Sequence, residues 1–165
     1  MSVDVLVREL QDDDWSALWP ILRDVFAAGE TYAIERDITE DAARRYWVEV
    51  PTETWVATDA DGALLGSYYL EPNQRGPGAH VAHCGYVVGP AARGRGVGRL
   101  LGEHSFDRAR ALGFRAMQYN CVVSTNRGAV RLWESLGFEE VGRVPAAFEH
   151  PSEGLVDALV MWRRL

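Results

Sequence analysis

The feature that most constrains the fold is a glycine-rich turn between an apolar segment and a segment with helical periodicity. Residues 84–88 form an apolar run that predicts a buried strand, and apolar residues recur at helical spacing over residues 97–112. Between them, glycine occupies every second position of residues 94–98. Full positive charges in or beside the turn come from Arg93, Arg95 and Arg99. Because the first N–H groups of a helix are unpaired and partly positive, the stretch predicts a phosphate or pyrophosphate site.

Three kinds of phosphate site can be compared with this turn. The P-loop pattern Gly-x-x-x-x-Gly-Lys-Ser/Thr is absent, and the dinucleotide pattern Gly-x-Gly-x-x-Gly fails because Arg99 stands at its last position. The third pattern, Arg/Gln-x-x-Gly-x-Gly/Ala after a strand and a proline, is present as Arg93-Gly94-Arg95-Gly96-Val97-Gly98. This hexapeptide resembles the acetyl-CoA pyrophosphate loop of the GNAT superfamily of N-acetyltransferases. A glycine-rich connection with solvated arginines is the alternative.

Length and composition indicate one globular domain over residues 1–165. The net charge of −7 argues against nucleic acid or an anionic membrane as a partner. Neither a signal peptide nor an apolar run of membrane-spanning length is recognisable. Cys84 and Cys121 lie in apolar segments, which predicts buried free thiols and a reducing, cytoplasmic location. His80 and His83 have no further ligands at metal-binding spacing, so we expect no metal site.

Apolar periodicity and turn residues predict strands and helices along the whole chain. The predicted strands are residues 3–7, 54–58, 63–70, 80–88, 116–123, 140–144 and 155–163. The predicted helices are residues 15–28, 39–48, 97–112 and 127–136, and irregular loops are expected at 30–34, 71–79 and 145–154. The strands at 80–88 and 116–123 must be parallel, because a helical crossover joins them.

A second motif follows the strand at 116–123. Residues 126–138, Asn-Arg-Gly-Ala-Val-Arg-Leu-Trp-Glu-Ser-Leu-Gly-Phe, resemble the GNAT segment Asn-x-x-Ala-x-x-Leu-Tyr-x-x-x-Gly-Phe. The two motifs stand in the family's order within the succession β α α β β β α β α β β, so the chain is identified as a member of the GNAT superfamily. The resemblance implies an α/β (α+β) fold. Its central mixed, mostly antiparallel sheet would contain a splayed parallel strand pair and be flanked by helices.

The resemblance also implies acetyl-CoA as the cofactor and a set of residues that hold it. These cofactor-binding residues are Tyr86, Val87, Val88, Arg93, Gly94, Arg95, Gly96, Val97, Gly98, Arg99, Asn126 and Trp133. Backbone groups of residues 86–88 would pair with the pantetheine, and those of residues 93–98 with the pyrophosphate. The Asn126 side chain would bind the pantetheine arm, cap the following helix, or do both. Trp133 stands where the family often has a tyrosine acid; an indole cannot supply that proton, so we expect Trp133 to pack beside the pantetheine.

A narrower resemblance is to the GNAT branch that includes the fungal proline-analogue acetyltransferases. It rests on Tyr68-Tyr69-Leu70-x-Pro72-Asn73, Cys84-Gly85-Tyr86 and Asn120-x-x-x-Ser124-Thr125-Asn126. In that branch an asparagine matching Asn120 lies beside the reacting centre. Another asparagine is usual at the position of His83.

Acetyl transfer to an amine requires a base, a polarised thioester carbonyl and a stabilised leaving thiolate. His83 is the first candidate for the base, because its ordinary pKa suits proton transfer near neutrality. It could instead bind substrate, or be a hydrogen-bonded strand histidine without a catalytic role. Asn120 is the second predicted catalytic residue. It, Ser124 or water could assist the thiolate, or CoA could leave unassisted.

The loop at 30–34 mixes aromatic and acidic residues and predicts a substrate lip. Glu30 and Tyr32, with His83, are therefore the predicted substrate-binding residues, while packing of Tyr32 on the core is the alternative. Glu149 and His150 are lesser candidates.

The leading functional interpretation is an acetyl-CoA-dependent N-acetyltransferase for a small-molecule amine or an amino-acid-like substrate. The amine would attack directly in a ternary complex. Acetylation of a protein N-terminus or lysine is one alternative. A catalytically silent acyl-CoA-binding module is another, and the tryptophan at position 133 favours it. Dimerisation is common in the family, so a homodimer is also an expectation.

Overall fold

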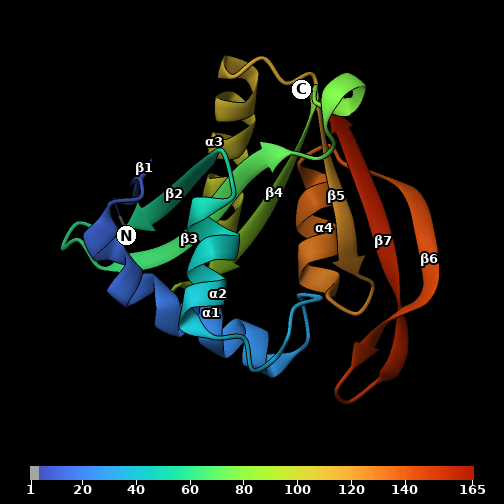
Figure 1. The fold of residues 1–165 in the computed structure, drawn as a ribbon, viewed down its shortest axis with the longest axis horizontal. Coiled ribbons are helices and arrows are strands. Elements are labelled where there is room, and N and C mark those ends of the chain that lie inside the picture. The colour runs from blue at the N-terminus through green and yellow to red at the C-terminus, as the bar shows by residue number, and fades with distance from the viewer. Residues whose placement is uncertain (1–3) are drawn as a thin grey trace.

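The computed structural model describes residues 4–165, so Val3, predicted to open the first strand, lies outside the described residues. The strands are β1 (Leu6–Glu9), β2 (Glu53–Thr58), β3 (Leu64–Pro72), β4 (Val81–Val88), β5 (Ala116–Val123), β6 (Glu139–His150) and β7 (Gly154–Arg164) (Figure 1). The helices are α1 (Trp15–Ala28), α2 (Glu40–Arg44), α3 (Val97–Ala111) and α4 (Arg127–Ser135). This is the predicted order of elements.

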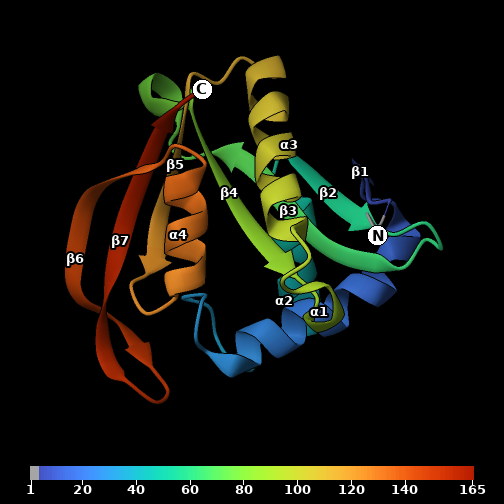
Figure 2. The ribbon, with the colours of Figure 1, turned by 180° about the vertical axis from the view of Figure 1, so that it is seen from behind.

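The strands form one sheet in the order β1-β2-β3-β4-β5-β7-β6. Every neighbouring pair is antiparallel except β4 and β5, which are parallel. The parallel pair is joined only at Val81–Ala116 and Ala82–Met117. Beyond these two pairs the strands separate toward their carboxyl ends, as Figure 2 shows. The predicted fold class, a mixed sheet with a splayed parallel pair, is confirmed.

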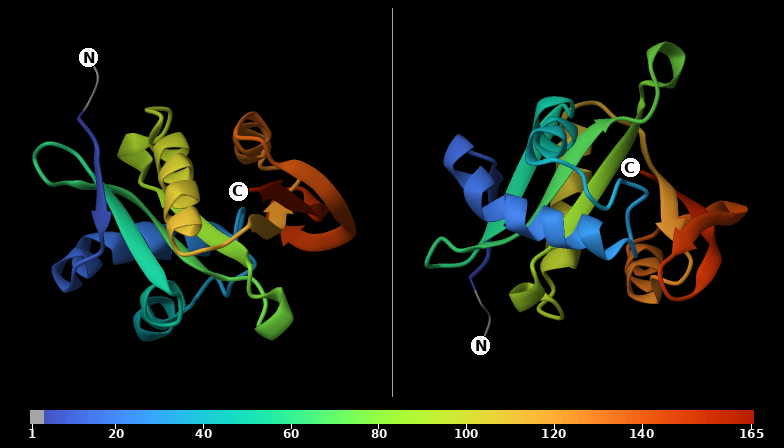
Figure 3. Two further views of the ribbon diagram at one scale, coloured as in Figure 1. Left: turned by 90° about the horizontal axis from the view of Figure 1, so that it is seen from above. Right: turned by 60° about the horizontal axis from the view of Figure 1, so that its bottom comes forward.

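Helices cover both faces of the sheet, α1 and α2 on one side and α3 and α4 on the other (Figure 3). Each face has its own apolar core. Leu22 and Phe26 of α1 pack with Trp47 on the first face. Leu101 of α3 and Trp133 of α4 pack on the second. Side chains of alternate β4 residues therefore enter different cores.

The helix predicted at 39–48 is observed as a short α-helix followed by a wider π-helical turn. Thr39 caps α2 by accepting the Ala42 N–H, and after Arg44 the chain continues as a π-helical turn over Arg45–Glu49. Trp47 in this turn is fully buried and donates its indole N–H to Ser67 Oγ at 3.0 Å. Such wide turns are rare and often lie at functional sites.

The prediction of an irregular loop at 145–154 is wrong, because β6 continues to His150. A bulge between Val144 and Phe148 absorbs the proline at 145, and Ala146 adopts a positive φ of 50°. Proline lacks an N–H donor, but β6 is an edge strand, where a bulge removes the need for one. Only the turn at 151–153 is irregular.

The prediction that both cysteines are buried is wrong for one of them. Cys84 is buried, but Cys121 is exposed. The register of β5 against β7 slips between Tyr119 and Val122, so the strand bulges where Cys121 lies. The bulge turns the Cys121 side chain out of the alternation that an apolar run suggests.

Candidate functional site

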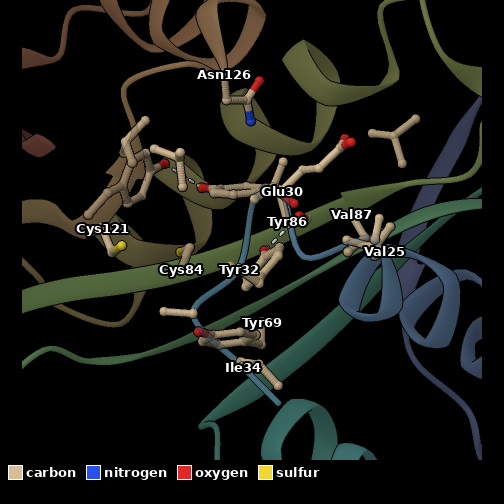
Figure 4. A pocket seen from close by; sticks show the side chains of 18 of the residues that line it. Val25, Glu30, Tyr32, Ile34, Tyr69, Cys84, Tyr86, Val87, Cys121 and Asn126 are labelled. Atoms are coloured by element: carbon tan, nitrogen blue, oxygen red, sulfur yellow. Dashed lines mark hydrogen bonds between the residues drawn. The ribbon is translucent and has the colours of Figure 1, made fainter. Parts of the chain in front are cut away.

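A cleft of about 670 Å³ opens where β4 and β5 separate. Its lining comes from α1, the loop at 30–34, the π-helical turn after α2, the strands β3, β4 and β5, the turn after β4, and α4 with its N-cap. Figure 4 shows Asn126 on one side of the cleft, Tyr69 on the other, and Tyr86 between them in this view. The predicted site residues that line the cleft are Glu30, Tyr32, His83, Tyr86, Val87, Val88, Arg93, Asn120, Asn126 and Trp133. The remaining predicted residues, Gly94, Arg95, Gly96, Val97, Gly98 and Arg99, follow Arg93 in the turn and the first turn of α3.

The backbone of β4 presents alternate residues to the cleft. The Val81 carbonyl and the Gly89 N–H are both bonded to the β3 side, at 2.8 Å and 2.7 Å. In an antiparallel ladder this direction alternates, so odd-numbered residues face β3 and even-numbered residues face β5. The N–H and C=O groups of Tyr86 and Val88 therefore face the opening. Those of Val87 face β3, and Val87 lines the cleft with its side chain.

The glycine-rich turn has the conformation and the space that an anion needs. Gly94 and Gly96 have φ angles of 74° and 80°, which favour glycine, and a Cβ at either would meet no atom within 4 Å. Gly96 is the N-cap of α3 and makes no side-chain cap, so no side chain covers the first N–H groups there. Arg99 donates to Ser135 Oγ at 2.7 Å, which holds α3 against the end of α4. The turn fits a pyrophosphate.

The wall opposite the loop at 30–34 is aromatic. Trp133 is buried and lies 4.7 Å from the Tyr86 ring and 4.8 Å from the Tyr119 ring, between centroids. The Tyr86 hydroxyl is 2.7 Å from both the Tyr119 hydroxyl and Ser105 Oγ. Asn126 accepts the Ala129 N–H at 3.3 Å and also lines the cleft, so its capping role leaves its NH₂ group available.

His83 lies on the α1–α2 side of β4. Its Nδ1 is 2.9 Å from the Gln118 carbonyl, which can only accept, so Nδ1 carries the proton. Burial lowers the pKa of His83, against a smaller opposing effect of that hydrogen bond. The imidazole is therefore neutral near pH 7, and its unprotonated Nε2 lies 3.4 Å from the Tyr69 hydroxyl.

Asn120 lies in the bulge of β5 and is exposed. Its Nδ2 donates to Asn73 Oδ1 at 2.7 Å, and its Oδ1 accepts from Gln118 Nε2 at 3.0 Å. The amide thus joins β5 to the end of β3 beside His83.

Tyr32 combines the two interpretations of its loop. Its ring packs edge-on against Phe26 and Trp47, at 5.4 Å and 5.9 Å. Its hydroxyl donates at 2.7 Å to the Tyr86 carbonyl, one of the groups that face the opening. Desolvation of the hydroxyl raises the pKa of Tyr32, so it stays protonated. Glu30 lines the cleft from the same loop.

The model of the acetyltransferase (GNAT) family matches residues 7–138. The chain belongs to the GNAT family. It is 33% identical over 148 residues to the N-acetyltransferase aca1 of Schizosaccharomyces pombe, covering 80% of this chain and 71% of that protein. A GCN5-related N-acetyltransferase from Kribbella flavida has a TM-score of 0.94 and 50% identity over 98% of both chains. A GNAT phosphinothricin acetyltransferase from Sinorhizobium meliloti, solved with acetyl-CoA, has a TM-score of 0.87 and 26% identity, covering 100% of this chain and 89% of its own.

Membership of the GNAT family makes the chain an N-acetyltransferase with acetyl-CoA as its acyl donor. The relation to a fungal N-acetyltransferase agrees with the narrower resemblance in the sequence. The glycine-rich turn and the edge of β4 fit this donor, since the turn offers free N–H groups and β4 does not pair with β5 beyond Ala82, although the Tyr86 carbonyl on this edge already accepts from Tyr32.

Three residues of the GNAT cleft region were not predicted. Tyr69 and Tyr46 line the cleft, with their hydroxyl oxygens 2.9 Å apart. Glu71 stands opposite His83 in the β3–β4 register, and burial raises the pKa of its carboxyl. Alternation along residues 68–71 could have put Tyr69 and Glu71 on one face. Only the cross-strand register brings them to His83.

The lesser candidates Glu149 and His150 lie apart from the cleft lining. Both end β6, where His150 Nδ1 accepts the N–H groups of Ser152 and Glu153 in the turn to β7. Within residues 4–165, no cluster of three metal-ligating side chains occurs, and no helix is long and apolar enough to cross a membrane.

Proposed function

We propose that the chain transfers the acetyl group to the amine of a small molecule or an amino-acid-like substrate, by direct attack within a ternary complex. One observation carries the proposal: a single cleft runs from Arg93, at the phosphate turn, to the neutral imidazole of His83. Both reactants can therefore share one space, which makes the step effectively unimolecular. The phosphinothricin acetyltransferase that the chain resembles is named for a small amino-acid-like acceptor, which favours this class.

The acetyl-CoA in this proposal extends from the glycine-rich turn into the gap of the sheet. N–H groups of residues 93–98, with Arg99, hold the pyrophosphate. The N–H of Tyr86 and the backbone groups of Val88, which face the gap, pair with the pantetheine, while the Tyr86 carbonyl stays bonded to the Tyr32 hydroxyl. Asn126 contributes its amide, and Trp133 packs beside the arm.

The chemistry follows from the groups at the other end of the cleft. The neutral amine attacks the thioester carbonyl, whose developing charge is stabilised by a backbone N–H of β4 that faces the gap. His83 accepts the proton that the attacking nitrogen loses. CoA leaves as a thiolate, because Trp133 cannot protonate it. The Asn120 amide, which lines the same cleft as His83, orients the acceptor.

The test is acetyl-CoA consumption with a panel of small amines, amino acids and peptides. Loss of thioester absorbance is the better signal, because exposed Cys121 would react with a thiol reagent. In the control without acceptor, no lysine of the protein itself can be acetylated, because the sequence contains none. Turnover with small amines supports the proposal. Turnover only with peptides, or acetyl-CoA binding without any turnover, contradicts it.

We further propose that residues 1–165 act as one domain in the cytoplasm. Cys84 and Cys121 are both free thiols, as expected in a reducing compartment. A single cooperative unfolding transition and recovery in the cytosolic fraction are the expected results. Two separate transitions, or secretion, would contradict these two statements respectively.

A further inference from the structure

Gly85 makes room for the ring of Tyr69 on the acceptor side of the sheet. The two residues are partners in the β3–β4 register. A Cβ at Gly85 would lie 2.8 Å from Tyr69 Cζ and 3.0 Å from the hydroxyl oxygen. Real Cβ atoms essentially never approach that closely, so only glycine lets the ring lie across β4. The ring is held from the other side by Trp47, edge-on at 4.9 Å.

This position inserts the Tyr69 hydroxyl into a chain of hydrogen bonds whose direction is fixed at one end. Because His83 Nδ1 donates to the Gln118 carbonyl, a neutral imidazole can only accept at Nε2. Tyr69 must therefore donate to Nε2, at 3.4 Å. The Tyr69 oxygen then accepts from Tyr46, 2.9 Å away.

Burial keeps the members of this chain neutral. Desolvation raises the pKa of Tyr69 and of Tyr46 and lowers that of His83. The other titratable groups that face the chain are Glu71 on β3, Tyr32 on the loop after α1, and Tyr119 on β5, whose ring lies edge-on to His83 at 6.5 Å. None of the three makes a hydrogen bond to His83. The lone pair of His83 Nε2 is thus directed at one hydroxyl.

We propose that Tyr69 relays the proton of the attacking amine to His83, which extends the acetyl transfer proposed above. As the nitrogen bonds to the acetyl carbon, its N–H bond breaks and an O–H bond forms at Tyr69 Oη. The original Tyr69 proton moves at the same time to His83 Nε2, giving imidazolium with Nδ1–H still on the Gln118 carbonyl. The C–S bond then breaks and CoA leaves as a thiolate. The imidazolium proton goes back through Tyr69 to the thiolate or to solvent.

Tyr69→Phe is the direct test, because it keeps the ring over Gly85 and removes only the hydroxyl. We expect kcat to fall about 10- to 100-fold, with acetyl-CoA affinity by calorimetry unchanged. The pH profile of kcat/KM should lose its acid limb, since the proton no longer reaches His83. If Tyr69 only supported the fold, a Tyr69→Phe variant with the parental melting temperature would keep both the parental kcat and the acid limb of the pH profile.

Tyr68→Phe is the matched control. Tyr68 is the neighbouring residue on the opposite face of β3, and its hydroxyl also bonds a histidine, His104 Nδ1, at 2.8 Å. Tyr68 does not line the cleft. This variant should keep kcat within about twofold of the parent. Gly85→Ala should resemble Tyr69→Phe in kcat, because it displaces the ring.

A measurement without turnover completes the test. Imidazole ¹⁵N shifts, assigned with a His83→Gln variant, should give the Nδ1–H tautomer for His83. The Nε2–H tautomer overturns the relay. So does parental kcat in Tyr69→Phe when the parent is active, and this leaves the proposed function standing. An inactive parent overturns the proposed function and the relay with it.

Discussion

Gly96→Val, paired with Gly113→Val, tests the phosphate turn. The two glycines flank α3, with φ angles of 80° and 87°, and a Cβ at either would meet no atom within 4 Å. The substitutions therefore carry the same backbone strain and no clash. A non-glycine residue in the left-handed region costs about 1–2 kcal/mol. Each variant should lose roughly 2–8 °C of melting temperature, since a domain of this size shifts by about 2–4 °C per kcal/mol.

Acetyl-CoA affinity should separate the pair. In Gly96→Val the new side chain would project into the space where the pyrophosphate approaches the N–H groups at the start of α3. Loss of one such bond to a charged group costs about 1.5–3 kcal/mol, which is about a 10- to 150-fold rise in Kd. Gly113 follows the far end of α3, so its variant should bind like the parent.

Isothermal calorimetry with acetyl-CoA measures this difference, and thermal melts of both variants check that the strain is equal. If Gly96→Val and Gly113→Val bind acetyl-CoA within about twofold of each other, the turn does not hold the pyrophosphate. If their melting temperatures differ widely, the assumption of equal strain is wrong.

Three further predictions concern other parts of the chain. His83→Ala should lower kcat by about 100-fold and leave acetyl-CoA affinity nearly unchanged; since burial lowers the pKa of His83, the parent's acid limb should lie below about 6.5. Unchanged turnover in that variant would remove His83 from the mechanism. At neutral pH, Glu53→Gln should lower the free energy of unfolding, measured in urea, by about 1 kcal/mol. The reason is that Arg108 donates to Glu53 Oε1, and this ion pair lowers the pKa of the carboxyl group. A carboxyl group whose pKa is lower in the folded state stabilises the fold at pH values above its unfolded pKa of about 4.3. The loss of stability in Glu53→Gln should therefore disappear as the pH falls through the folded pKa. A loss that does not depend on pH would contradict this. Burial raises the pKa of both thiols, that of Cys84 to about 12, but only Cys121 is exposed. Iodoacetamide should therefore label Cys121 alone, and more slowly with acetyl-CoA present; equal labelling of both thiols would refute the assignment.

The parts of the site that are contiguous in sequence could be predicted. The turn at 93–98 shows its glycines directly, and the left-handed φ of Gly94 and Gly96 explains why they are needed. Asn126 is recognisable as a helix cap from its place before an apolar-periodic segment, and it does cap α4.

The parts that depend on pairing between strands could not be predicted. Tyr69 faces Gly85 and reaches His83 only because β3 and β4 pair in one particular register. Alternation assigns a residue to a face of the sheet but leaves its cross-strand neighbour open. Bulges have the same effect, because the one in β5 exposes Cys121 against the apolar pattern around it.

The spacing of residues on β4 explains how one strand can serve both reactants. A strand repeats every two residues, so His83 and Gly85 point to the α1–α2 face, while Cys84 and Tyr86 point to the α3–α4 face. The same alternation turns the backbone of Tyr86 to the gap and that of Val87 to β3. Because His83 and Tyr86 are an odd number of positions apart, their side chains lie on opposite faces of the sheet. When the His83 imidazole faces the acceptor, the Tyr86 side chain therefore packs in the core on the α3–α4 face. Inserting one residue between them would put both side chains on one face, and the imidazole or the open backbone edge would leave the cleft.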